Sequence, residues 1–178
     1  MTNFAPIEPG AATGEAAELL RQVKAALGVV PNMTKGMANS PTLLRSFLAL
    51  SGAVGKGTLA PAVRERLAIA TAQLNGCEYC LSAHTFLGAN VAKIDAAELE
   101  KARRGGSADT HVAALLELSN AIAQNAGDLD ETDIKAARDA GATEEEIGEV
   151  VANLALNIMT NYFNVLARTE TEFPLVSL

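Results

Sequence analysis

The chain has 178 residues, of which 49% are hydrophobic and 20% are charged, and its formal charge of −7 gives an isoelectric point near 4.8. This balance is typical of one globular domain, so we expect residues 1–178 to form a single domain with its own core. The acidic charge argues against nucleic acid and acidic membrane surfaces as partners, and no apolar run reaches the roughly 18 residues of a membrane span.

The N-terminal part of the chain predicts an arm and two helices. Residues 1–12 contain prolines and a glycine without any period, which is typical of an extended arm that needs a neighbour to be ordered. Apolar residues recur at spacings of three and four over 15–27 and predict a first helix that ends at Gly28. Ser40 and Pro41 are a favourable N-cap and first-turn pair, so a second helix is expected to begin there.

Two more helices are predicted on either side of a tight turn. The first begins at Pro61 and ends at Asn75 and Gly76, which together are a strong turn signal. The next segment, CEYCLSAHTFLGA, has no breaker before Gly88. We therefore expect a helix whose first turn contains both cysteines of the chain.

Further helices are predicted in the C-terminal half. Thr143 and Glu146 have the spacing of a capping box in front of a long apolar segment. We expect these helices near 95–104, 109–126, 130–141 and 143–167, with the tail FPLVSL docked or exchanged. Because Ala, Leu and Glu are abundant and only 4% of the residues are aromatic, the whole chain is predicted to be all-α.

Cys77 and Cys80 carry the main chemical signal. Cysteines this close cannot cross-link distant parts of a chain, so in a reducing compartment they indicate redox or metal chemistry. Positions three and four apart share one face of a helix, which places Cys80 beside both Cys77 and His84. The positive end of the helix dipole and a nearby imidazole both stabilise a thiolate. The N-terminus has no signal-peptide pattern, so a cytoplasmic location is expected.

Glu65 lies on the predicted helix that precedes the cysteines. If the turn at Asn75 and Gly76 packs the two helices antiparallel, the Glu65 carboxylate would hold His84 in place and receive its proton. Taken by itself, Glu65 stands in an Arg-Glu-Arg run that also fits a solvated helix face.

These residues together suggest a thiol reaction with a peroxide. A thiolate attacks the terminal peroxide oxygen and becomes a sulfenic acid, and a second thiol condenses with it to a disulfide. We assign the attack to Cys80, because His84 lies one turn after it and acts as its base, and the resolving role to Cys77. The opposite order stays open, since the more N-terminal cysteine is nearest the helix dipole.

Glu65, Cys77, Cys80 and His84 together form the motif E-x11-C-x2-C-x3-H, and at these residues the chain resembles the AhpD-like alkylhydroperoxidases, which belong with the carboxymuconolactone decarboxylase proteins. The segments RERLAIATAQLNGCEYCLSAH and NLALNIMTNYFNVLARTETEFP look like the peroxidase-related branch. The resemblance covers most of residues 40–174.

The resemblance implies an AhpD-like helical bundle with its core at about 40–174 and the redox CxxC at the start of a helix. It further implies a homo-oligomer, a trimer or hexamer, with no metal or organic cofactor. The implied partners are a hydroperoxide substrate and a dithiol reductant, either a protein or a lipoyl domain. Family members have a histidine just before the second cysteine, where this chain has Tyr79, a phenol of much higher pKa that can still donate a hydrogen bond.

Several alternatives remain open. The two cysteines could be inert core residues, or two thiolates, an imidazole and a carboxylate could bind zinc, although three of these ligands would crowd one helix. The function could be that of a carboxymuconolactone decarboxylase-like enzyme, although no organised set of basic residues for anion binding is visible. A non-catalytic helical oligomer that only senses oxidants is the third possibility.

A few other polar residues stand out. Asn157, Asn161 and Asn164 line one side of an apolar segment and need partners if they are buried, so we expect them at a pocket or an interface. His111 follows the predicted start of the helix at 109–126 and is expected to face solvent or cap the helix, with no part in catalysis.

Overall fold

The computed structural model describes residues 2–178. All secondary-structure elements in that range are helices, which confirms the predicted all-α class. The helices are α1 (Gly14–Leu27), α2 (Asn32–Met37), α3 (Pro41–Val54), α4 (Pro61–Leu74), α5 (Glu78–Asn90), α6 (Ala96–Arg103), α7 (Thr110–Asn125), α8 (Glu131–Asp139) and α9 (Glu144–Ala167). The predicted helices are all present close to their expected bounds. The sequence does not predict α2, because its six residues are too few to repeat an apolar spacing.

Local capping explains where several helices begin and end. Ser40 Oγ accepts a hydrogen bond from the N–H of Leu43 and begins α3. Thr143 and Glu146 form the predicted capping box of α9, each side chain accepting from the other residue's backbone N–H. Gly28 ends α1 with a φ of 76°, a left-handed conformation that glycine adopts without strain. These contacts pair backbone groups that a helix end leaves free, and a good N-cap is worth about 1 kcal/mol.

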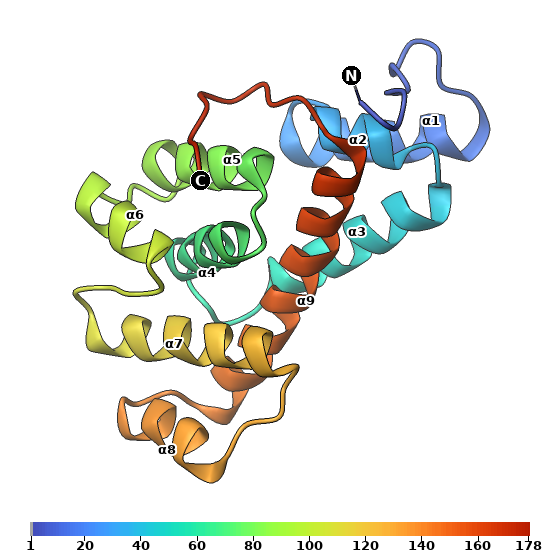
Figure 1. Cartoon of the computed structure of the whole chain (residues 1–178). Coiled ribbons are helices and arrows are strands. Elements are labelled where there is room, and N and C mark those ends of the chain that lie inside the picture. The colour runs from blue at the N-terminus through green and yellow to red at the C-terminus, as the bar shows by residue number, and fades with distance from the viewer. Residues whose placement is uncertain (1) are drawn as a thin grey trace.

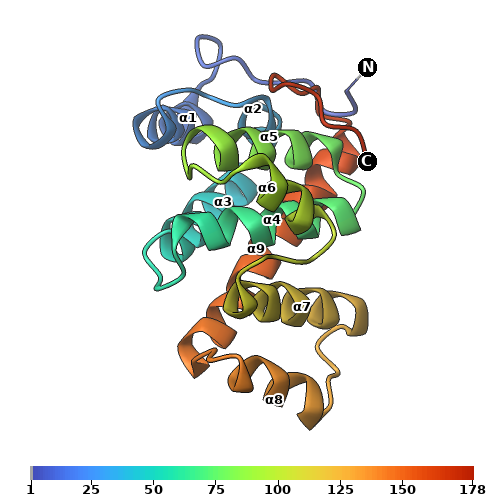
Figure 2. The same cartoon turned by 90° about the vertical axis from the view of Figure 1, so that its left-hand side faces the viewer.

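The longest helix, α9, runs through the length of the molecule (Figure 1). It contacts α3, α4, α5 and α7, with α7 and α8 at one end of the molecule and α1 to α3 toward the other (Figure 2). Three clusters of buried apolar side chains form the core: one among α4, α7, α8 and α9, one among α1, α2, α3 and α9, and one among α4, α5 and α6. Each fully buried Leu or Ile contributes roughly 1.5–3 kcal/mol, so these clusters fix the helices around the space between them.

A tight turn folds α5 back along α4, as the signal at Asn75 and Gly76 predicts. Gly76 has a φ of 65°, where a Cβ would be strained, so glycine suits the position. The N–H of Cys77 donates to the carbonyl oxygen of Ala72 over 2.9 Å and closes the turn. The two helices pack closely along their lengths, which is the arrangement that the proton relay requires.

The N-terminal arm is held by two elements. Of the predicted arm, residues 2–12 contain turns and bends with no helix, and residue 1 lies outside the described range. The N–H of Asn3 donates to the carbonyl oxygen of Ala167 over 2.7 Å, and the N–H of Ile7 donates to that of Lys35 over 3.1 Å. The arm is therefore ordered by neighbours, as expected, at the end of α9 and on α2.

The C-terminal tail, residues 169–178, crosses from the end of α9 to α5 (Figure 1). The N–H of Val176 donates to Ser82 Oγ over 2.9 Å, and Arg103 Nη2 donates to the carbonyl oxygen of Ser177 over 2.7 Å. Of the two expected arrangements, the tail thus adopts the docked one on its own chain.

By length and composition, α9 is the one helix in the described range that could cross a membrane. However, 50% of its most apolar window is buried against the rest of the chain, as in the core helix of a globular domain. Its apolar character is therefore explained in part by packing.

The remaining apolar residues of α9 form a stripe that faces solvent. Val151, Tyr162 and Val165 expose 49%, 61% and 50% of their surfaces, and Leu166 exposes 62%. With the exposed Ala155 and the partly buried Ile158, positions 151, 155, 158, 162 and 165 follow the spacing of four and three residues that helix–helix seams use. Such a continuous apolar surface is typical of a protein interface.

We expect this stripe to pack against another copy of the chain in a homo-oligomer. Light scattering at micromolar concentration should then give a mass above the 18.5 kDa of one chain. Tyr162→Glu should lower that mass, because it places a charge in an apolar contact. A monomeric mass for the unaltered protein would remove this prediction.

His111 ties the start of α7 to the start of α9. Its Nε2 lies 3.0 Å from Glu146 Oε1, and its Nδ1 lies 3.2 Å from the carbonyl oxygen of Ala140. The ring is only partly exposed, so His111 connects two helices and does not simply face solvent. The hydrogen bond to Glu146 raises the pKa of His111.

We expect His111→Gln to destabilise the fold more at about pH 5.5 than at about pH 8.5. The pKa of His111 is raised on folding, so its stabilisation is complete below about 6.5, the ordinary value, and is lost as the pH rises through the folded pKa. The effect should stay below about 1 kcal/mol, because the pair is partly exposed and screened. Urea unfolding of both proteins at the two pH values measures it. Equal losses of unfolding free energy at the two pH values would show that the ionisation of His111 does not contribute to stability.

Candidate active site

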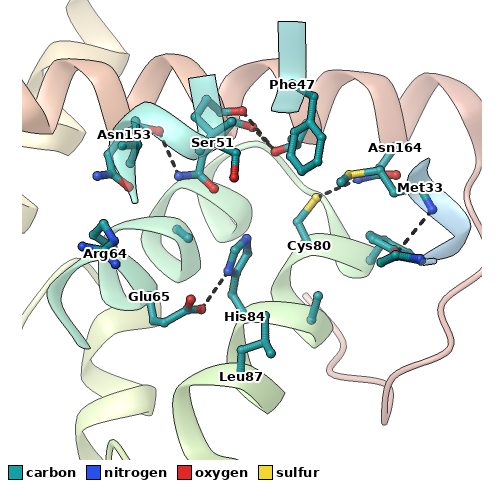
Figure 3. A pocket seen from close by; sticks show the side chains of 18 of the residues that line it. Met33, Phe47, Ser51, Arg64, Glu65, Cys80, His84, Leu87, Asn153 and Asn164 are labelled. Atoms are coloured by element: carbon teal, nitrogen blue, oxygen red, sulfur yellow. Dashed lines mark hydrogen bonds and ion pairs between the residues drawn. The ribbon is translucent and has the colours of Figure 1, made fainter. Parts of the chain in front are cut away.

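A cavity of about 320 Å³ opens between α3, α4, α5 and α9, with α2 and the C-terminal tail at one side. Its walls are mostly apolar, and its polar side chains come from α3, α4, α5 and α9 (Figure 3). This size is at the small end of ligand pockets in proteins. The apolar walls include Met33, Phe47, Val54, Leu87, Leu156 and Phe173.

Glu65 and His84 meet on one wall of this cavity. The Nδ1 of His84 lies 2.8 Å from Oε2 of Glu65, and both side chains are about three-quarters buried, with 25% and 22% exposed. Because the carboxylate accepts a hydrogen bond from Nδ1–H, the tautomer with a free Nε2 is favoured. Figure 3 shows the ring pointing into the cavity, which Cys80 also lines. The antiparallel helix pair thus brings together the two residues that the sequence places far apart.

The Arg-Glu-Arg run around Glu65 is not a solvated face. Arg64 lines the cavity and donates from Nη1 to the carbonyl oxygen of Leu59. Arg66 points the other way, and its Nη2 lies 3.6 Å from the largely buried carboxylate of Glu98. All three side chains of the run are partly buried, so the surface interpretation of Glu65 is wrong.

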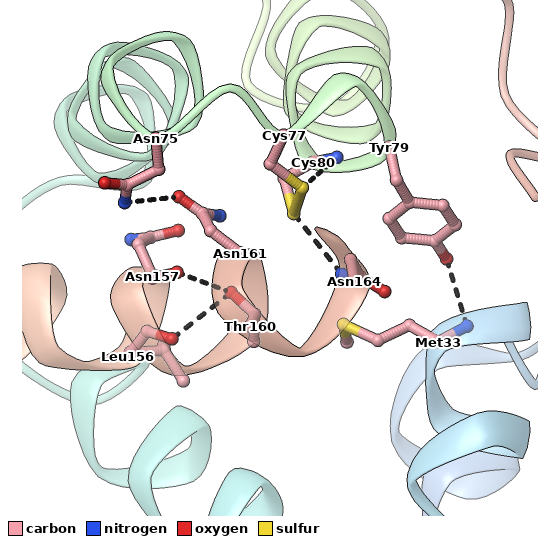
Figure 4. The surroundings of a disulfide bond; sticks show 10 residues. All are labelled: Met33, Asn75, Cys77, Tyr79, Cys80, Leu156, Asn157, Thr160, Asn161 and Asn164. Carbon is pink, nitrogen blue, oxygen red and sulfur yellow. Dashed lines mark hydrogen bonds between the residues drawn. A yellow bond between two sulfur atoms is a disulfide. The ribbon is translucent and has the colours of Figure 1, made fainter. Parts of the chain in front are cut away.

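Cys77 and Cys80 are joined as a disulfide at the start of α5, with their Cα atoms 5.4 Å apart (Figure 4). Cys77 is the N-cap residue, and its sulfur accepts the N–H of Cys80 over 3.2 Å. Only 1% of Cys77 and 3% of Cys80 is exposed, and of the two only Cys80 lines the cavity. The pair therefore presents one sulfur to the cavity and keeps the other behind it.

A row of asparagines on α9 forms the opposite wall. Asn157 and Asn164 line the cavity as expected, and Asn164 Nδ2 lies 3.3 Å from the sulfur of Cys80. Asn161 instead accepts a hydrogen bond from Asn75 over 3.0 Å. Asn153 also lines the cavity and was missed, although it lies four residues before Asn157, a spacing that would have indicated it.

Tyr79 lies at the edge of the cavity beside the C-terminal tail. Its hydroxyl donates to Glu172 Oε1 over 3.1 Å and accepts the N–H of Met33 over 3.4 Å. Its ring meets that of Phe173 edge to face, with centroids 6.0 Å apart. Burial, followed by the charge of Glu172, raises the pKa of Tyr79 far above its ordinary value. Tyr79 is therefore a hydrogen-bond donor and not a base.

Within residues 2–178, no group of three or more His, Cys, Asp and Glu side chains is arranged to hold a metal ion. Besides His84, the basic side chain that lines the cavity is Arg64.

The fold of the chain is shared with several solved structures. A peroxidase-related protein with an alkylhydroperoxidase AhpD core from Ralstonia eutropha JMP134 superposes with a TM-score of 0.84 at 22% identity, covering 96% of this chain and 92% of its own. A peroxidase-related protein from Silicibacter sp. TM1040 has a TM-score of 0.78 at 22% identity, covering 96% and 94%. The debrominase Bmp8 has a TM-score of 0.76 at 19% identity, covering 97% and 93%.

No curated protein gives a significant sequence match. The chain is nevertheless an all-helical protein with the AhpD-like fold and a CxxC pair at the start of a helix. Residues 41–124 match the carboxymuconolactone decarboxylase family and contain Glu65, both cysteines and His84. Over residues 41–124 the chain thus resembles the carboxymuconolactone decarboxylase family, and over most of its described length it shares the AhpD-like fold.

Proposed function

We propose that this protein is a thiol-dependent hydroperoxide reductase that uses Cys77 and Cys80 as its dithiol. The observation that carries the proposal is the pairing of His84 with Glu65 beside the cavity-lining sulfur of Cys80. A base held by a carboxylate next to a thiol is the arrangement that activates a nucleophilic cysteine. The CxxC pair at disulfide distance supports a redox role.

In the first step, His84 Nε2 takes the proton of the Cys80 thiol, while Glu65 stabilises the imidazolium through Nδ1. The thiolate attacks the terminal oxygen of the hydroperoxide, an S–O bond forms and the O–O bond breaks. The leaving alkoxide takes the proton back from His84 and departs as the alcohol. Cys80 is then a sulfenic acid, and the peroxide has accepted two electrons from its sulfur.

In the second step, Cys77 attacks the sulfur of the sulfenic acid. A disulfide forms, and the hydroxyl leaves with the proton of Cys77 as water. An external dithiol then reduces the disulfide by thiol exchange and becomes oxidised itself. Since both sulfurs are almost fully buried, we propose a slender dithiol that can enter the cavity, such as a lipoyl arm. This cycle needs a reducing compartment, consistent with the cytoplasm.

The positions of the two cysteines relative to the cavity support the order Cys80 first and Cys77 second. A peroxide in the cavity meets Cys80, whereas Cys77 lies behind it as the N-cap of α5. The mostly apolar walls favour an organic hydroperoxide over a small polar one.

A reductive dehalogenase is the second candidate. The fold is shared with the debrominase Bmp8, one structure of which contains 2,3,4-tribromopyrrole. The cavity is mostly apolar, and three aromatic side chains line it: Phe47, Tyr79 and Phe173. The same dithiol would supply two electrons: the carbon–halogen bond breaks, the carbon gains a proton, the halide leaves, and the cysteines form their disulfide.

A steady-state assay with tert-butyl hydroperoxide and dihydrolipoamide tests the proposal. We expect continuous loss of peroxide with the unaltered protein and none with Cys80→Ser. Oxidation of both cysteines of the chain without turnover would instead support the redox-sensing oligomer. Halide release from a brominated pyrrole, without peroxide loss, would favour the second candidate.

A further inference from the structure

Asn164, near the end of α9, has one half of its amide against the reactive sulfur and the other half unpaired. Its Nδ2 lies 3.3 Å from the sulfur of Cys80 (Figure 4). The side chain is 3% exposed, and its Oδ1 has no hydrogen-bond partner among the described residues. Buried amide oxygens are almost always paired, so an orphan acceptor at a cavity wall indicates a ligand that donates a hydrogen bond.

We propose that Asn164 positions both reactants of the peroxidase step. Its N–H donates to the Cys80 thiolate, and its carbonyl oxygen accepts the O–H of the hydroperoxide. This inference rests on the proposed function and extends it to the substrate class, because it requires a peroxide with a terminal O–H.

The first half of the inference follows from the burial of Cys80. Removing a thiolate from water raises the pKa of the thiol unless donors compensate for the lost solvation. The amide of Asn164 is such a donor, and it adds to the effect of the α5 N-terminus. The contact in this structure is made to a disulfide sulfur, which stands in for the thiolate. Both can only accept hydrogen bonds, so the amide nitrogen faces the sulfur and the oxygen is left for another partner.

The second half follows from the geometry of one amide group. The Nδ2 and Oδ1 atoms of Asn164 are bonded to the same carbon. A group that donates a hydrogen bond to Oδ1 therefore lies close to the Cys80 sulfur that Nδ2 contacts. A hydroperoxide carries its hydrogen on the terminal oxygen, which is the atom that the thiolate attacks. The hydrogen bond would therefore hold that oxygen beside Cys80, and the sulfenic acid O–H would take the same place after the reaction.

Asn161 offers a matched control on the same helix. It is fully buried, and within residues 2–178 its amide nitrogen has no hydrogen-bond partner, but its oxygen accepts from Asn75 and it does not line the cavity. A substitution at Asn161 therefore removes a buried amide of α9 without removing a contact to sulfur.

The first experiment measures the rate of iodoacetamide alkylation against pH in protein with Cys77→Ser, where Cys80 is the one remaining cysteine. Asn164→Leu should move the profile to higher pH by about one unit, a tenfold lower thiolate fraction below the pKa. Asn164→Asp, which keeps the shape but replaces the donor with a negative charge, should move it further. Asn161→Leu should leave it in place. Coincident profiles for Asn164→Leu and its parent, or equal shifts for both leucine variants, would overturn the proposed hydrogen bond from Asn164 to the Cys80 thiolate.

The second experiment separates the substrate contact from the thiolate effect. At a pH above the thiol pKa of every variant, Asn164→Leu should react with iodoacetamide at the rate of its parent but with tert-butyl hydroperoxide up to about a hundredfold more slowly. An unchanged rate with the peroxide, or an equal fall in rate with both reagents, would overturn the proposed hydrogen bond from the hydroperoxide to Asn164. Asn164→Ser, whose side chain is too short to reach both partners, replaces the leucine variant if circular dichroism shows that the latter is unfolded. The alkylation profiles need no turnover, so failure of the proposed function and failure of this inference are distinguishable.

Discussion

Cys80→Ser should abolish the consumption of hydroperoxide, whereas Cys77→Ser should allow one reaction per chain and leave a sulfenic acid on Cys80. The reason is position: Cys80 lines the cavity beside His84, and Cys77 is almost fully buried behind it. Without Cys77 no thiol of the same chain can condense with the sulfenic acid, so the cycle stops after the first step. Trapping with dimedone followed by mass spectrometry identifies the oxidised residue, and a peroxide assay measures the turnover.

Ser82 gives a control for substitution on α5. It is buried on the same helix but does not line the cavity, and Arg103 also holds the tail that Ser82 contacts, so Ser82→Ala should keep peroxide turnover. Trapping the sulfenic acid on Cys77 in the Cys80→Ser protein would reverse the order of the two cysteines.

Glu65→Gln should keep the fold but slow the reaction with hydroperoxide by about ten- to ten-thousand-fold, the range for a lost acid–base group. The carboxylate accepts from Nδ1 of His84 at 2.8 Å, and its charge stabilises the imidazolium that forms when Cys80 gives up its proton. Glutamine keeps the size of the side chain but removes that charge. The apparent pKa of the reactive cysteine should therefore rise.

Alkylation by iodoacetamide over a range of pH measures this shift without requiring turnover. Glu117→Gln is the control, because Glu117 is exposed on α7 and does not line the cavity. Superimposable profiles for Glu65→Gln and the unaltered protein would reduce the relay to Cys80 and His84 alone.

The site residues could be predicted from the sequence because their relation is mostly local. Cys77, Cys80 and His84 fall within the first two turns of one helix, where the helical repeat alone decides which side chains share a face. Glu65 needed one further step, the turn at Gly76, and a tight turn between two helices leaves little choice of packing.

The helix bounds were likewise encoded locally, in the N-cap Ser40, the C-cap Gly28 and the capping box of α9. These signals act through backbone groups within four residues, so they need no knowledge of the rest of the chain. The short helix α2 has too few residues for a periodic pattern, and its position depends on contacts with α1, α3 and α9.

The tertiary structure alone decided what surrounds the reactive sulfur. Asn164 and Phe173 follow Cys80 by more than eighty residues, and they reach it because the apolar clusters of the core hold α9 and the tail against α5. The same packing places Glu172 beside Tyr79, so the phenol hydroxyl of Tyr79 donates a hydrogen bond to it. Such contacts depend on many weak apolar interactions between segments far apart in the chain, so they cannot be inferred from any short segment of the sequence.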